Sequence, residues 1–240
     1  MKRTWNDVLS LPAYIVSLPS QPERYECAFH RATQAGFTDL HPWAGVDARN
    51  PETLSREWAN HGSPKFAAWD VAFTTTHLGK QGCMLAHLNL IKWMIEHRLP
   101  AMVVFEDDIL FHPKWDILAP VYWDQTPESA GIVFFGSGFN YQHYILPVVQ
   151  ASCVCTHAYL IELETAKRLY HFLTRHPSGV YTIDVMMCHY ESFVLQNPMV
   201  ERIFNWVCWN GRLDPVPTID TICNSGLVIQ DGNFVSSINK

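Results

Sequence analysis

The sequence predicts an α/β protein with a mostly parallel central sheet flanked by helices. Short apolar runs, which are typical of buried strands, alternate along the chain with longer segments whose apolar residues recur at helical spacing. The chain has 240 residues, of which 48% are hydrophobic, enough for one large core. We therefore expect a single domain over residues 1–240, with an irregular tail from about residue 210 that is rich in Asp, Asn, Gly and Pro.

Apolar runs predict the strands of this sheet. Residues 13–18 (AYIVSL) form the first run, which Pro19 stops, and residues 40–46 form the second, which contains Pro42. Residues 101–106 (AMVVFE) form a third run before an acidic stretch. Later strands are expected at residues 132–137 and over a longer region at residues 151–162.

Helical punctuation and spacing predict the helices between these strands. Residues 22–36 begin with Pro at a first helical position and end in Gly36. Residues 79–100 carry the strongest helical pattern, which Pro100 ends. Its apolar stripe consists of Met84, Leu88, Ile91 and Ile95, widened by Leu90 and Met94. We also expect a helix over residues 163–177, a short helix after Ile183, and over residues 49–78 a long loop with some helix.

Charge and composition exclude several classes of protein. The formal net charge is −6 and no run of Lys and Arg occurs, so nucleic acid is not an expected partner. Asp7 and Pro12 interrupt the segment where a signal peptide would be apolar, and no run of about eighteen apolar residues predicts a transmembrane helix. The seven cysteines include no CxxC pair and indicate free thiols in a reducing compartment. We therefore expect a cytoplasmic protein.

Three adjacent acids, Glu106, Asp107 and Asp108, directly follow the third apolar run. Like charges repel, and turn chemistry after a strand explains one or two acids more easily than three. Ligands of α/β sheets bind at the carboxyl ends of strands, and carboxylate oxygens suit hard ions such as Mn²⁺ or Mg²⁺. On an extended segment Glu106 and Asp108 point the same way. We therefore predict that one of them holds a divalent ion, whose remaining positions bind a diphosphate, and that the other holds the same ion or a ribose hydroxyl.

Other side chains are candidates for the same site. Lys80 and Gln81 open the long helix, where a helix N-terminus attracts phosphate, although a solvated first turn is the alternative. His157 follows Thr156 on a predicted strand and is a candidate metal ligand. His87, within the long helix, is expected to be a buried histidine with a hydrogen-bond partner.

Several stretches of the chain resemble glycosyltransferase family 25 in order, spacing and residue type. The stretches are IVSLPSQPER, WAGVDA, GKQGCMLAHLNLIKWMIE, LPAMVVFEDDILF, CTHAYLIELETAKRL, TIDVMM and NPMV. Together they run from roughly residue 13 to residue 201. The family includes lipooligosaccharide galactosyltransferases and collagen galactosyltransferase domains.

The resemblance implies a GT-A fold with a nucleotide-binding, Rossmann-like half, a nucleotide-sugar donor and usually Mn²⁺. By match to the family's motifs, Glu106, Asp107 and Asp108 would form the metal and donor segment. Asp47 would lie near the nucleoside and Arg24 near the nucleotide.

The chain also departs from the family pattern near the expected donor pocket. Residues 17–20 read Ser-Leu-Pro-Ser where the family usually has Asn-Leu-Asp-Arg. Lys80 stands where an acid is common, and Cys155 stands where a Gly usually precedes Thr-His-Ala-Tyr. These differences bear on the identity of the donor.

The function that these features predict is metal-dependent transfer of a hexose from a UDP-hexose to a glycan or glycoprotein acceptor. The family resemblance alone favours UDP-galactose or UDP-glucose as the donor. The family resemblance implies inversion at the anomeric carbon. A carboxylate would take the proton of the acceptor hydroxyl. Asp184 is the candidate, since it lies in the stretch that resembles the family's Pro-Ile-Asp segment, although a helix cap is its alternative role. Glu191 is the second candidate.

Two other functions remain open on the sequence. A nucleotidyltransferase could also use an acidic cluster at a strand end with a divalent ion, but no Gly-rich phosphate loop supports it. A catalytically degenerate module that binds a nucleotide sugar is the non-enzymatic alternative. The three differ in product: UDP with a glycosylated acceptor, pyrophosphate, or binding without turnover.

Overall fold

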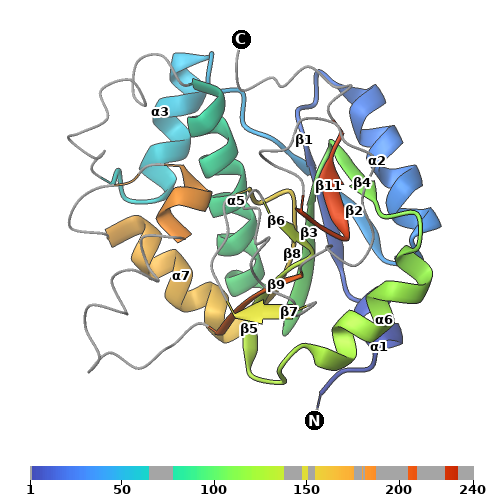
Figure 1. Ribbon diagram of the computed structural model, residues 1–240. Coiled ribbons are helices and arrows are strands. Elements are labelled where there is room, and N and C mark those ends of the chain that lie inside the picture. The colour runs from blue at the N-terminus through green and yellow to red at the C-terminus, as the bar shows by residue number, and fades with distance from the viewer. Residues whose placement is uncertain are drawn as a thin grey trace.

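A seven-stranded sheet runs through the centre of the computed structural model (Figure 1). The structure describes residues 2–64, 78–137, 148–150, 155–175, 180, 182–187, 205–209 and 225–231. In order across the sheet, the strands are β2 (Leu40–Ala44), β1 (Ala13–Ser17), β3 (Ala101–Glu106), β8 (Ala158–Glu162), β5 (Ala130–Phe134), β9 (Asn205–Trp209) and β7 (Val148–Gln150).

Five of these seven strands point the same way. β1 is parallel to β2 and to β3, and β5 is parallel to β9. β8 lies antiparallel between β3 and β5, which gives β5 the direction of β3, and β7 is antiparallel to β9. The expected α/β class, with a mostly parallel sheet flanked by helices, is therefore confirmed.

Helices cover both faces of the sheet (Figure 1). These helices are α1 (Trp5–Leu9), α2 (Pro22–Gln34), α3 (Pro51–Asn60), α5 (Leu78–Glu96), α6 (Trp115–Gln125) and α7 (Leu163–Arg175). Alternation along β3 divides the core in two. Met102 and Val104 pack with residues of α5 and α7, whereas Val103 and Phe105 pack with residues of α1, α2 and α6.

Two short ribbons lie beside the main sheet. β4 (Ile109–Phe111) pairs antiparallel with β11 (Val228–Gln230), and β6 (Gly136–Ser137) pairs with β10 (Ser225–Gly226). The expectation of an irregular tail from about residue 210 is therefore wrong for residues 225–231. Leu227 and Val228 are apolar and buried there, which supplies the reason for the pairing.

Two other boundaries differ from the sequence prediction. The described part of the expected strand at residues 151–162 is strand only from Ala158, because residues 155–157 are irregular, with a bend at residue 157. The long helix ends at Glu96 and not at Pro100. Arg98 has a φ of 53°, and the Leu99 amide donates to the Met94 carbonyl. The helix therefore ends in a left-handed turn that precedes Pro100.

The remaining expectations about helices agree with the structure. α2 ends where Gly36 adopts a φ of 98°. Within residues 49–78 the described part contains α3, which the Asn50 side chain caps by accepting from the amides of Glu52 and Thr53. A short helix occupies residues 183–187.

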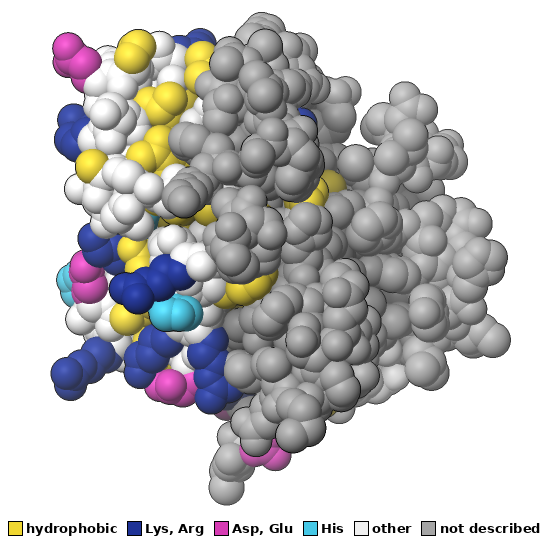
Figure 2. All heavy atoms as spheres, turned by 90° about the vertical axis from the view of Figure 1, so that its left-hand side faces the viewer, with side chains coloured by type: hydrophobic (Ala, Val, Ile, Leu, Met, Phe, Trp, Pro, Cys, Tyr) yellow, Lys and Arg dark blue, Asp and Glu magenta, His cyan; other side chains and the backbone are white. Residues whose placement is uncertain are grey.

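The outer face of the layer that contains α3 and α7 mixes basic, acidic and apolar side chains over its described part (Figure 2). Among the described helices, none has the length and apolar character that crossing a membrane requires.

Candidate functional site

A cleft of about 790 Å³, including its open mouth, lies at the carboxyl ends of β1 and β3. The loop after β2 and the first half of α5 complete its walls. Gly82 permits this, because a Cβ atom there would lie 2.3 Å from the Val46 carbonyl oxygen, so α5 packs directly against that loop. The polar and charged side chains that line the cleft include Ser17, Arg24, Asp47, Arg49, Cys83, His87, Glu106, Asp107 and Asp108.

Strand alternation separates the first two acids of the triplet. Glu106 continues the side of β3 that carries Met102 and Val104, and therefore points toward α5. Asp107 points the other way and meets α2. The sequence prediction placed Glu106 and Asp108 on one extended segment, but residues 107–108 form a turn, and Asp108 shares the Arg24 guanidinium with Asp107.

Asp107 is bound by side chains of two neighbouring elements, β1 and α2. Its Oδ2 accepts a hydrogen bond from the Ser17 hydroxyl at 2.7 Å, and its Oδ1 accepts from Arg24 Nε at 2.8 Å. Arg24 Nη2 also contacts Asp107 and reaches Asp108 Oδ2 at 3.3 Å. The side chains of Arg24 and Asp107 are each 11% exposed, so this ion pair joins β1, α2 and the end of β3 beneath the cleft.

Glu106 is held by groups from two other elements. Thr156 Oγ1 donates to its Oε1 at 2.8 Å, and His87 Nε2 lies 3.4 Å from the same oxygen. Burial acts to raise the pKa of Glu106, but the His87 and Thr156 side chains outweigh it, and the pKa falls below its ordinary value. Glu106 therefore carries its negative charge at neutral pH.

Asp108 is the least compensated acid of the three. Burial, reinforced by the charges of Glu106 and Asp107 and opposed by that of Arg24, raises its pKa to about 7. Its Oδ1 is buried and has no hydrogen-bond partner. A divalent cation would relieve both conditions, so the residues present fit the ion that the sequence predicts.

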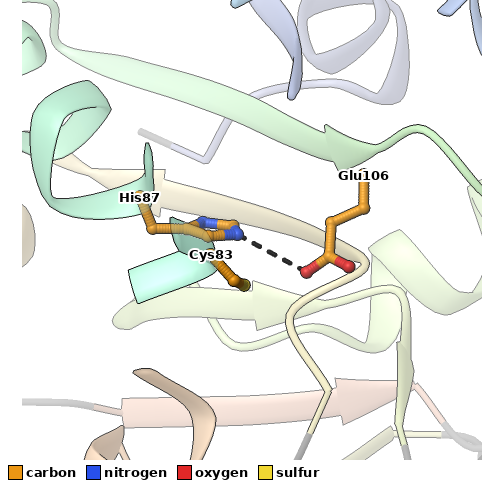
Figure 3. Close-up of side chains that lie close together, drawn as sticks. All are labelled: Cys83, His87 and Glu106. Atoms are coloured by element: carbon orange, nitrogen blue, oxygen red, sulfur yellow. Dashed lines mark ion pairs between the residues drawn. The ribbon is translucent and has the colours of Figure 1, made fainter. Parts of the chain in front are cut away.

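Cys83 and His87 approach Glu106 from one face of α5 (Figure 3). The Cys83 sulfur, a His87 nitrogen and a Glu106 oxygen all lie within 4.8 Å of one another. His87 is fully buried, and its Nδ1 lies 2.9 Å from the Tyr159 hydroxyl, which confirms the expected buried histidine with a hydrogen-bond partner. Burial, with the charges of Glu106 and Asp184, raises the pKa of the Cys83 thiol well above its ordinary value.

A bidentate pair stands at the mouth of the cleft. Arg49 donates from Nε and Nη2 to the two oxygens of Asp47, at 2.7 and 2.6 Å. The side-chain hydrogen bonds from Arg49 hold the pKa of Asp47 below its ordinary value. The sequence prediction included Asp47 but missed Arg49, although a basic residue two positions after a candidate acid was a visible signal.

Two candidates from the sequence, Lys80 and Gln81, do not line this cleft. Gln81 is 1% exposed, and its Oε1 accepts from the indole nitrogen of Trp58 at 3.1 Å, which holds α3 against α5. Lys80 lies beside it in the first turn of α5. A role for either residue in binding the donor stays a prediction.

His157 lies behind the cleft and does not line it. The ring is fully buried, its Nε2 lies 2.8 Å from the Val228 carbonyl oxygen, and Nδ1 has no hydrogen-bond partner. Its charge acts on Glu106, so the two are near, but metal ligation by His157 stays a prediction.

Asp184 lies in the first turn of the helix at residues 183–187 and not at its cap. Its Oδ2 accepts from the backbone amide of Cys155 at 3.3 Å, and its charge acts on the Cys83 thiol, which places it near the inner end of the cleft. Cys155 has a φ of 73°, a left-handed conformation that explains why glycine suits this position. Glu191 lies outside the described residues.

Comparisons with known proteins agree with the resemblance. The profile of glycosyltransferase family 25, described as an LPS biosynthesis protein family, matches residues 10–129, which is half of the chain. This region contains β1, β2, α5, β3 and the acidic triplet. Among curated proteins, none matches the sequence.

Similar solved structures include two glycosyltransferases. One takes part in glycosylation of the major capsid of PBCV-1, with a TM-score of 0.41 and 9% identity over 83% of this chain and 80% of that chain. The other is mouse xyloside xylosyltransferase 1 in its apo form, with a TM-score of 0.37 and 10% identity over 84% of this chain and 76% of that chain.

Proposed function

This chain belongs to glycosyltransferase family 25 and is a glycosyltransferase, and on that premise we propose that it moves a hexose from a UDP-sugar to a glycan or glycoprotein acceptor with the help of a divalent ion. The observation that carries the proposal is Asp108. It is a partly buried acid beside Glu106, with a buried oxygen that lacks any hydrogen-bond partner and a pKa raised to about 7. Such a group is costly unless a cation binds it.

The ion is Mn²⁺ or Mg²⁺, with Glu106 and Asp108 as its protein ligands. Such an ion, when bound, neutralises the charge that develops on the diphosphate as the sugar leaves. Asp107 is already committed to Arg24 and Ser17, so its role is to hold the segment in place. Arg24 contacts both Asp107 and Asp108, and this brings a guanidinium to the side of the cleft where the diphosphate would lie.

The nucleoside binds at the mouth of the cleft. Asp47 can accept a hydrogen bond from a ribose hydroxyl, and its bidentate contact with Arg49 orients the carboxylate for this. UDP-galactose and UDP-glucose are the donors that the family resemblance favours. Both carry the same nucleoside diphosphate, so the same contacts serve either.

The proton of the acceptor hydroxyl passes to Asp184, with inversion at the anomeric carbon. Asp184 lies near the Cys83 end of the cleft and is distant in sequence from the ion ligands. A carboxylate that does not bind the cation remains basic enough to accept a proton. Glu191 is the alternative base.

The test combines a product assay with a thermal-unfolding assay. With Mn²⁺ present, UDP should stabilise the protein by about 2.7 kcal/mol at a concentration one hundred times its Kd, and the shift should vanish in EDTA or in Asp108→Ala. UDP-sugar and an acceptor should then yield free UDP and a glycosylated product. An equal shift in EDTA would show that Arg24 and its neighbours bind the diphosphate without an ion. Pyrophosphate as the product would indicate a nucleotidyltransferase, and binding without turnover would indicate a degenerate binding module.

A further inference from the structure

Three ligand types of a transition-metal site converge from two elements on the inner wall of the cleft (Figure 3). Cys83 and His87 are four residues apart on α5 and therefore lie on one face of the helix, one above the other. Glu106 meets them from the end of β3, because alternation along that strand directs it toward α5. All three side chains line the cleft, so an ion between them would be reached from solvent.

The separations of the three groups suit a tetrahedral ion. His87 Nε2 and Glu106 Oε1 are 3.4 Å apart. Two such ligands on one zinc ion, each at about 2.0–2.1 Å, lie about 3.3–3.4 Å apart. A thiolate at about 2.3 Å from the same ion would lie about 3.6 Å from each of them. Since all three atoms already lie within 4.8 Å of one another, at most about 1.2 Å of movement by Cys83 completes the set.

The His87 ring supplies an independent observation. The side chain is fully buried, and Nε2, the nitrogen that faces Glu106, has no hydrogen-bond partner. His61 is also buried, but there Nδ1 lies 2.8 Å from the Tyr170 hydroxyl and Nε2 lies 2.8 Å from Asn89 Oδ1. Buried ring nitrogens in native proteins normally have such partners. The nearest group that faces Nε2 of His87 is the Glu106 carboxylate at 3.4 Å, and without a hydrogen bond this nitrogen is available as a ligand of an ion between the two.

Neighbouring groups hold two of the three ligands in place. The Tyr159 hydroxyl, 2.9 Å from His87 Nδ1, fixes the ring orientation and leaves Nε2 for the ion. The Thr156 hydroxyl, 2.8 Å from Glu106 Oε1, orients the carboxylate. Hydrogen bonds of this kind to first ligands are the usual support of a metal site in proteins.

We propose that Cys83, His87 and Glu106 bind one thiophilic divalent ion of the Zn²⁺ class. Cys83 binds as the thiolate and its proton passes to solvent. Thiolate and imidazole ligands select such an ion over Mg²⁺ or Ca²⁺. Three protein ligands leave a fourth position open to the cleft, and the ion links α5 to β3. It shares Glu106 with the ion proposed for the donor, but its binding requires neither UDP nor Asp108.

The test uses Co²⁺ as the probe, because cobalt bound to a thiolate gives a charge-transfer absorption band. Under reducing conditions, and without any nucleotide, the wild-type chain should bind Co²⁺ with this band, and Zn²⁺ should abolish the band by displacement. Cys83→Ser should lose the band, and His87→Gln should bind Co²⁺ at least tenfold more weakly. Cys27→Ser is the matched control and should keep the band, because that free thiol lies on α2.

Three results would overturn the proposal. One is a wild-type chain that shows no thiolate band, and another is a band that survives in Cys83→Ser. The third is loss of the band in Asp108→Ala, which would make Asp108 a ligand of the same ion and contradict a site formed by Cys83, His87 and Glu106. Circular dichroism checks the fold of each variant, and if Cys83→Ser fails to fold, the weaker Co²⁺ binding of His87→Gln remains as the test. The Co²⁺ absorption does not depend on turnover, so the test of this ion site can succeed or fail even if the proposed transferase activity is absent.

Discussion

Glu106, Asp107 and Asp108 are neighbours in sequence but have three different electrostatic environments. Asp107 is neutralised by Arg24, Glu106 faces His87 and Thr156, and Asp108 keeps an oxygen without a partner. The negative charge is therefore well compensated at Asp107, whereas at Asp108 it is destabilising. This difference makes the third acid, and not the second, the better candidate for an ion ligand.

Asp108 should make stability depend on pH in the absence of metal. Its pKa is raised from 3.8 to about 7 in the folded chain, so the folded state holds the proton more tightly than the unfolded state. The contribution of Asp108 to the free energy of unfolding is therefore most favourable at low pH, and it falls as pH rises from about 4 to about 7. In EDTA, Asp108→Asn should be more stable than the wild type at pH 8 and should lose most of that advantage toward pH 4. Between pH 5 and pH 8 the difference should change by up to about 2–3 kcal/mol.

Urea unfolding of both proteins across this pH range measures the effect. Every other group is common to the two chains, so the difference isolates Asp108. A stability difference that does not change with pH would mean that Asp108 has an ordinary pKa. Added Mn²⁺ should reverse the sign, since the ion stabilises only the wild-type carboxylate.

Asp184→Asn tests the proposed base. The amide is close in size to the acid and can still accept from the Cys155 amide, so fold and UDP affinity should persist. The rate of transfer should fall by about 10²- to 10⁴-fold. UDP affinity and turnover are measured on one preparation, with Asp116→Asn in the exposed first turn of α6 as the control that keeps its rate. Unchanged turnover would make Glu191 the next residue to test, and lost UDP affinity would assign Asp184 to the donor site.

At the scale of an element, the end of α5 stores backbone strain. Arg98 adopts a φ of 53°, while the amides of Arg98 and Leu99 donate to the carbonyls of Ile95 and Met94. This is the left-handed helix end that glycine usually occupies, and α2 ends with Gly36 in the same conformation. Any side chain other than glycine is disfavoured there by sterics between Cβ and the backbone.

Arg98→Gly should therefore raise the free energy of unfolding by about 0.5 to 1 kcal/mol. Arg98 is exposed, so little packing is lost. Arg98→Ala should give no gain, and Gly36→Ala should lower stability by about 1 kcal/mol or more, since its Cβ would also lie 3.3 Å from Leu9 Cδ1. Chemical denaturation ranks the three variants. A stabilising effect of Arg98→Ala equal to that of Arg98→Gly would assign the gain to lost charge and not to the backbone.

At the scale of the whole molecule, residues 225–231 return to the site from far along the chain. β11 pairs with β4 directly after the acidic triplet, and the Asp231 amide donates to the Asp108 carbonyl oxygen at 2.5 Å. Arg31 of α2 reaches Asp231 Oδ2 at 2.7 Å and the Ile109 carbonyl at 3.0 Å. One guanidinium thus joins α2, β4 and the returning segment.

Arg31→Met should destabilise the protein by about 1 to 3 kcal/mol, because the Asp231 side chain is only 4% exposed and loses its cation. Hydrogen exchange at β4 and β11 should accelerate as the pairing weakens. Arg56→Met is the control, since its guanidinium is 66% exposed beside Glu57 and should contribute less than about 1 kcal/mol. Equal effects of the two variants would show that the returning segment does not depend on Arg31.

The sequence alone determined the fold class, the family and the position of the acidic triplet. The fold class and the triplet depend on local patterns: apolar runs for β1 and β3, helical spacing for α5, and acids placed directly after a strand. These patterns succeed because a strand or helix is chosen mainly by residues a few positions apart. The family, and with it Asp47 and Arg24 as candidates, came from the stretches that resemble the family's motifs.

Only the tertiary structure decided which acid is paired, which histidine nitrogen is free and which candidates line the cleft. Gln81 packs against Trp58, Arg49 joins Asp47, and Cys83 meets Glu106 across a gap of more than twenty residues. Residues 225–231 were expected to be irregular because they belong to a tail rich in Asp, Asn, Gly and Pro, yet they pair with β4 and β6. Such contacts depend on the packing of elements distant in sequence. No local periodicity encodes them, because burial, charge compensation and ligand distance arise only once the sheet and its helices have assembled.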